Sequence, residues 1–115
     1  MEISLKQISE ITGIRVEVLE FALLMEKKLK ENDHKGGWEN CSPIYLLNKL
    51  KEEVDEVELS LDMALDNFHR EKIMLMRHEC ADTANFCMML SQNFSDPKYV
   101  KFNKMKKENP GLIQP

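Results

Sequence analysis

The sequence predicts an all-α fold, a helical bundle built from a single domain of 115 residues. Hydrophobic residues make up 43% of the chain and charged residues 31%, a balance typical of a globular protein. With only four Gly and four Pro, the long stretches of Leu, Met, Glu and Lys favour helices. Apolar residues also recur at intervals of three and four, and no segment alternates convincingly as a strand would.

The first part of the chain predicts two helices and a polar loop. Residues 4–12 form a short helix that ends near Gly13, and residues 15–31 form a longer one. The apolar stripe of the longer helix consists of Val18, Phe21, Ala22, Leu24, Met25 and Leu29. The loop that follows, NDHKGGWENCSP at 32–43, holds two glycines and the only tryptophan of the chain.

Two long helices are predicted next. Ser42 is an expected N-cap and Pro43 an expected first helical residue, since proline at that position loses no intrahelical hydrogen bond. The third helix should break at about 66–69, and a fourth runs over 69–93. The third helix has apolar residues at alternating intervals of three and four, which predicts packing along its whole length. These residues are Leu47, Leu50, Val54, Val57, Leu61, Ala64 and Phe68.

The ends of the chain are predicted to belong to the same domain. Residues 1–14 form an N-terminal segment that caps the bundle or helps the chain to dimerise. Asp96 and Pro97 begin a short basic helix that runs to about residue 108, so that 94–115 comprise a basic helix and a tail.

Two pairs of acids stand on the two long helices. Glu53 and Glu56 are three residues apart, as are Glu79 and Asp82, so each pair projects from one face of its helix. Each pair is centred about 13 residues from the expected turn near residue 68, or roughly 20 Å along its helix. In an antiparallel helical hairpin the four carboxylates therefore lie level with one another.

Four facing carboxylates are unfavourable unless a positive charge offsets their repulsion. Hard divalent cations prefer oxygen ligands, so Mg²⁺ is the expected cofactor, with Mn²⁺ as a substitute. The alternative is a solvated or salt-bridged seam, because acids fill 20 of the 115 positions and short motifs arise by chance.

These residues resemble a known family, the MazG-type all-α nucleoside triphosphate pyrophosphohydrolases. The family pattern is E-E-x-x-E, a spacer and E-x-x-D on two antiparallel helices; here it reads EEVDE at 52–56 and ECAD at 79–82, with 22 residues between. A tryptophan shortly before the first motif is also similar to the family, and Trp38 stands 14 residues before Glu52. Together with the loop, the motifs most resemble a small phage and bacterial branch, the MazZ-like enzymes, over residues 21–93.

The resemblance implies an Mg²⁺-dependent hydrolase that converts a (d)NTP to its monophosphate and pyrophosphate. It points to dATP and dGTP as candidate substrates. Carried over by position, the metal ligands would be Glu53, Glu56, Glu79 and Asp82. Glu52 and Glu53 would be the catalytic acids, with Glu52 orienting a ligand or activating the attacking water.

Five further residues are candidates for substrate binding, each with an alternative role. Trp38 would stack on a base or wall its pocket, or else fill the core. Lys35 in the loop and Lys101 and Lys104 near the C-terminus would contact phosphates, although the last two also fit a solvated basic face. Asn85 continues the face of the second acid pair and would bind sugar or phosphate, or serve as an amide between helices.

The resemblance also implies a homodimer or homotetramer, because members of the family cover helix surface by association. Three cysteines without a framework spacing indicate reduced thiols, and no secretion signal opens the chain. We therefore expect a cytoplasmic protein (in the host cytoplasm if phage-encoded) that does not enter membranes. A net charge of −4 gives no reason to expect binding to a nucleic acid polymer.

Two other functions remain as alternatives. A catalytically inactive helical interaction module fits the same residues, because motif acids can persist in an inactive protein. A helix-turn-helix DNA-binding regulator is suggested by residues 2–20, which have Gly13 at the expected turn. That segment holds two basic residues, Lys6 and Arg15, against four glutamates, a balance that would repel phosphates.

Overall fold

The computed structural model describes residues 2–94, which form helices and contain no strand. The elements in chain order are α1 (Leu5–Thr12), α2 (Val16–Glu31), the 3-10 turn η1 (Asp33–Lys35), α3 (Pro43–Asp66) and α4 (Arg70–Phe94). The predicted all-α class is confirmed for this part of the chain, and the helix bounds agree with expectation to within a residue. None of these helices is long and apolar enough to cross a membrane. The basic helix expected over 97–108 lies outside the described residues.

Local sequence signals account for where the helices begin and end. At the start of α1, Ser4 forms a capping box with Gln7, in which each side chain bonds the backbone N–H of the other. Gly13 ends this helix with a φ of 77°, a left-handed conformation that glycine adopts without strain. At the start of α3, the Ser42 side chain accepts a hydrogen bond from the N–H of Tyr45. The predicted N-cap is therefore confirmed.

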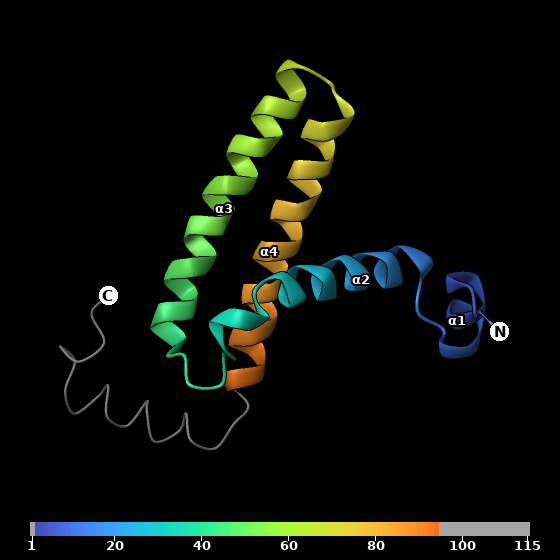
Figure 1. Ribbon diagram of the computed structural model, residues 1–115, viewed down its shortest axis with the longest axis horizontal. Coiled ribbons are helices and arrows are strands. Elements are labelled where there is room, and N and C mark those ends of the chain that lie inside the picture. Colours follow the sequence, from blue (N-terminus) through green and yellow to red (C-terminus); the bar gives the residue numbers. More distant parts are fainter. Residues whose placement is uncertain (1, 95–115) are drawn as a thin grey trace.

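The two long helices α3 and α4 lie side by side, and residues 67–69 connect them at one end (Figure 1). Helix α2 crosses the C-terminal half of α4, whereas α1 lies beside the start of α2, away from α3 and α4 (Figure 1). A hydrogen bond of 3.0 Å from Asn85 Nδ2 to the carbonyl oxygen of Met25 fixes α2 against α4. This crossing brings the loop after α2 to the acid-bearing part of the long helices.

The buried core is small. Among the described residues the buried side chains are Leu46, Ser60, Ala64, Ala81, Asn85 and Asn93. The prediction that α3 packs along its whole length is wrong for the single chain, because Val54 is 49% exposed, Leu61 42% and Phe68 83%. The physical reason is that α4 covers one face of α3, and no other described helix lies over the part near the turn (Figure 1).

Candidate metal centre

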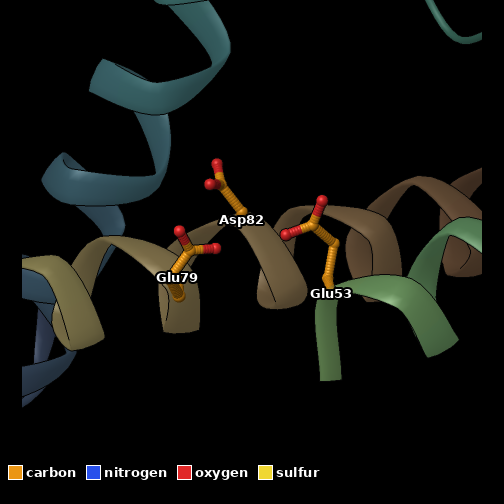
Figure 2. Close-up of side chains that lie close together, drawn as sticks. All are labelled: Glu53, Glu79 and Asp82. Carbon is orange, nitrogen blue, oxygen red and sulfur yellow. The ribbon is translucent and has the colours of Figure 1, made fainter. Parts of the chain in front are cut away.

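Three of the four predicted metal ligands come together. Glu53 projects from α3, and Glu79 and Asp82 project from α4, with their carboxyl groups directed into the same space (Figure 2). One oxygen of each carboxyl lies within 4.8 Å of the others, and all three side chains are half-buried. The arrangement supplies three hard oxygen donors to one point, which is the ligand chemistry that Mg²⁺ and Mn²⁺ prefer.

The electrostatics of these carboxyls is unfavourable to their charged forms. Burial raises the pKa of Glu53, and the negative charges of Asp82 and Glu79 raise it further. Burial also raises the pKa of Glu79, with Asp82 and Glu56 adding to the effect. In Asp82 the pKa is raised by burial, against the opposing effect of the Lys28 ammonium. A cation at this point would relieve the repulsion, so the residues fit a divalent metal.

The other two acids of the first motif lie at the margin of this cluster. Glu56 is exposed and is not among the three carboxyls that converge, although its charge acts on both Glu53 and Glu79. Glu52 is also exposed, and its Oε2 lies 3.2 Å from the ammonium of Lys49. The structure therefore groups Glu53 with the second motif and leaves Glu52 and Glu56 at the solvent edge.

A cavity of about 620 Å³ opens beside the cluster, between the end of α2, the loop after it, and the facing parts of α3 and α4. This volume falls within the roughly 300–1,000 Å³ of typical ligand pockets. Its lining includes the acids Glu31, Glu52, Glu53 and Asp82, the lysines Lys28, Lys35 and Lys49, the aromatic residues Trp38, Tyr45 and Phe86, and Asn85. Negative, positive and aromatic groups thus share one cavity, a combination that suits a ligand with phosphates and a ring.

The loop tryptophan is attached to the end of α4. The indole N–H of Trp38 donates a hydrogen bond of 2.8 Å to Oε1 of Gln92. The backbone carbonyl oxygen of Trp38 accepts a hydrogen bond of 2.9 Å from Nδ2 of Asn93. Gly36 in the same loop has a φ of 89°, a backbone conformation in which a residue with a side chain would be strained. Trp38 is half-buried and lines the cavity. Its ring therefore forms part of the cavity wall and is not a fully buried core side chain.

Asn85 has features of both roles that the sequence left open. It is 4% exposed, and its Nδ2 bonds the Met25 carbonyl, as an amide between helices would. It also lines the cavity, and its buried Oδ1 has no hydrogen-bond partner among the described residues. Buried polar atoms without partners are uncommon in folded proteins, and a polar ligand would satisfy this one. Lys35 lines the same cavity, whereas Lys101 and Lys104 lie outside the described residues.

Several polar residues of this site were not predicted from the sequence. Lys28, Glu31, Asn32, Tyr45 and Lys49 all line the cavity. The pairing of Lys49 with Glu52 was visible as an i, i+3 spacing, whereas nothing in the local sequence brings Lys28 to Asp82. Comparison with protein-family models, curated proteins and solved structures gives no significant match to the chain. The assignment of the site therefore depends on these residues themselves.

Proposed function

We propose that this protein is a Mg²⁺-dependent nucleoside triphosphate pyrophosphohydrolase, which converts a (d)NTP to its monophosphate and pyrophosphate. The observation that carries the proposal is the convergence of Glu53, Glu79 and Asp82 at the margin of a cavity that also holds lysines and aromatic rings. The acids suit a metal ion, the lysines suit phosphates and the rings suit a base. The MazG-like motif pattern supports the same activity.

In the proposed site, Glu53, Glu79 and Asp82 hold the metal, and Glu56 reaches it from the solvent edge. When bound, Mg²⁺ neutralises phosphate charge and lowers the pKa of a coordinated water. Mn²⁺ would serve as a substitute because it accepts the same oxygen ligands. The raised pKa values of the three converging acids support this assignment, since a cation would stabilise their charged forms.

Hydrolysis in this proposal is a displacement at the α-phosphorus. The oxygen of a water molecule forms the new bond to phosphorus, the bond to the bridging oxygen breaks, and pyrophosphate leaves. Glu52 accepts the proton of the water, because it is exposed to the cavity and held beside Lys49. Lys35 contacts phosphate oxygens and Trp38 contacts the base, with dATP and dGTP the first substrates to test.

We further propose that α3 and α4 form an antiparallel hairpin whose distal end is covered by another copy of the chain. The apolar residues that are exposed near the connection at 67–69 include Leu59, Met63, Leu65, Phe68, Met74 and Leu75. A face of this kind on a small chain is typical of association between subunits. A homodimer or homotetramer would bury it.

The activity is tested by measuring pyrophosphate release from a panel of dNTPs and NTPs with Mg²⁺. Replacement of a metal ligand, as in Glu53→Ala or Asp82→Ala, should lower kcat/KM by at least about 100-fold. Glu58→Ala, which removes an exposed acid of the same helix, is the matched control. Full activity in Glu53→Ala would remove this residue from the mechanism.

The alternative function, a non-catalytic helical interaction module, is separated by a binding measurement. A metal that binds only the folded protein raises its free energy of unfolding, by about 1.4 kcal/mol at ten times Kd. For a chain of this size that corresponds to a midpoint shift of about 5 °C. No shift at millimolar Mg²⁺ or Mn²⁺ would argue against the metal site and favour the interaction module.

A further inference from the structure

Lys28 brings a positive charge from α2 to the acidic cluster. Its Nζ lies 2.9 Å from Oε2 of Glu31 and 3.8 Å from Oδ2 of Asp82. Among residues 2–94 it is the lysine whose ammonium lies within ion-pair distance of a converging carboxyl. Its hydrogen bond to Glu31 raises the pKa of the ammonium, burial opposes this, and the charges of Asp82 and Glu79 add to the rise.

The same lysine faces the cavity. Lys28, Glu31 and Asp82 all line it, and the Lys28 side chain is only 17% exposed. The cavity also holds Asn85, which is 4% exposed and whose Oδ1 has no partner among the described residues, so a polar ligand is indicated there independently of the acids. The Lys28 ammonium therefore lies at the boundary between the space for a metal and the space for a polar ligand.

Two cations close to one carboxylate repel each other. The Lys28 ammonium stabilises Asp82 where a divalent metal would also bind, so the lysine and the metal compete for this carboxylate. Phosphates in the cavity would offer negatively charged oxygens that the Lys28 ammonium can contact while it keeps its hydrogen bond to Glu31. The same side chain should therefore weaken binding of the metal alone and strengthen binding of the metal with phosphates.

We propose that Lys28 is a phosphate-binding residue. Without a metal, its ammonium neutralises Asp82; when a metal binds Asp82, the ammonium contacts the nucleotide phosphates instead. The hydrogen bond to Glu31 keeps the ammonium at the cavity in both cases. This inference rests on the proposed function, because it places a triphosphate beside the acids. It makes metal and nucleotide binding mutually supportive, since each removes a charge that opposes the other.

The test uses the whole chain and measures binding by calorimetry, with Mg²⁺ alone and then with α,β-methylene-dATP or inorganic tripolyphosphate in the presence of Mg²⁺. In Lys28→Met the affinity for Mg²⁺ alone should rise about threefold or more. The affinity for either phosphate compound should fall about tenfold. Lys28→Arg should restore phosphate binding, because it keeps the positive charge.

Lys30→Met is the matched control, because Lys30 is an exposed residue of the same helix outside the cavity lining and its loss changes the net charge equally. It should leave both affinities within about twofold, as expected of a screened surface charge. Midpoints of thermal unfolding identify any variant that does not fold, and in that case Lys28→Gln replaces Lys28→Met.

The outcomes separate this inference from the proposed function. Opposite changes in the two affinities support the role of Lys28, even if the wild type hydrolyses no nucleotide and the proposed activity fails. Parallel losses in Lys28→Met, or no change in either affinity, would overturn the inference while leaving hydrolysis intact. A wild type that binds neither Mg²⁺ nor the phosphate compounds would overturn both.

Discussion

The indole N–H of Trp38 donates to Oε1 of Gln92 at 2.8 Å, across 54 positions of sequence. The loop after α2 is thereby joined to the C-terminal end of α4, and the ring of Trp38 is held against the cavity beside the acidic cluster. A hydrogen bond and a ring surface are thus combined in one residue, and substitutions can separate them.

Trp38→Ala should weaken nucleotide binding about tenfold, because stacking of a base on an aromatic ring contributes roughly 1–3 kcal/mol. Affinity for Mg²⁺ alone should not change, since Trp38 supplies no ligand. Trp38→Phe is the control that keeps a ring but loses the hydrogen bond to Gln92. If Trp38→Ala lowered only the free energy of unfolding, a purely structural role would be the better description.

Replacing one acid of the cluster should stabilise the metal-free protein. In Glu79→Gln or Glu53→Gln a neutral amide relieves repulsion among half-buried carboxylates, with a gain in the free energy of unfolding of up to about 1 kcal/mol. The same variants should show little or no rise in midpoint with Mg²⁺, because a ligand is missing. Chemical denaturation with and without metal measures both effects. A variant that loses stability without metal would contradict the repulsion described above.

The metal-free protein should lose stability as the pH rises through the acid range. Glu53, Glu79 and Asp82 have a raised pKa in the folded state, so the folded chain binds more protons than the unfolded chain between the ordinary and the raised values. The favourable contribution of these three acids to the free energy of unfolding is present below about pH 4. It is lost as the pH rises through their pKa values in the folded state.

Mg²⁺ should remove this loss, because it stabilises the charged carboxylates. Unfolding measured at closely spaced pH values, with and without metal, tests both statements. The exposed Glu31 contributes to stability with the opposite pH dependence, because its hydrogen bond to Lys28 lowers its pKa. Glu31→Gln in the same series separates its contribution. A metal-free stability that increased steadily with pH would contradict the prediction.

Two buried asparagines of α4 allow a matched comparison. Asn85→Ala and Asn93→Ala should each lower the free energy of unfolding by about 1 kcal/mol, because each removes a buried side-chain hydrogen bond to a backbone carbonyl. Only Asn85 lines the cavity, so only Asn85→Ala should also weaken nucleotide binding in calorimetry. Equal effects of both variants on binding would indicate that Asn85 acts through folding alone.

The exposed apolar residues near the connection between α3 and α4 should mediate self-association. We expect analytical ultracentrifugation to give the mass of a dimer or tetramer, because Phe68, Leu65 and Leu59 are left largely exposed by a single chain. Phe68→Glu should shift the distribution toward the monomer. Glu71→Gln, at an exposed polar position nearby, is the control. A wild-type mass that stayed monomeric at all concentrations would contradict this.

The sequence by itself determined the helices and the identity of the acids. Helical periodicity and the caps at Ser4, Ser42 and Gly13 act over a few residues, so the bounds of the helices could be predicted from local chemistry. The i, i+3 spacing placed Glu79 and Asp82 on one face of their helix for the same reason. Capping and helical spacing depend only on residues a few positions apart, so they do not depend on which helices pack together.

Only the tertiary structure decided which groups meet. The crossing of α2 over α4 brings Lys28 to Asp82 and Met25 to Asn85, and neither contact has a local signal because the partners are more than 50 residues apart. The same packing groups Glu53 with the second acid pair and leaves Glu56 exposed, although spacing alone treats Glu53 and Glu56 alike. Periodicity states which face of a helix is apolar, whereas the neighbouring helices determine which part of that face is covered.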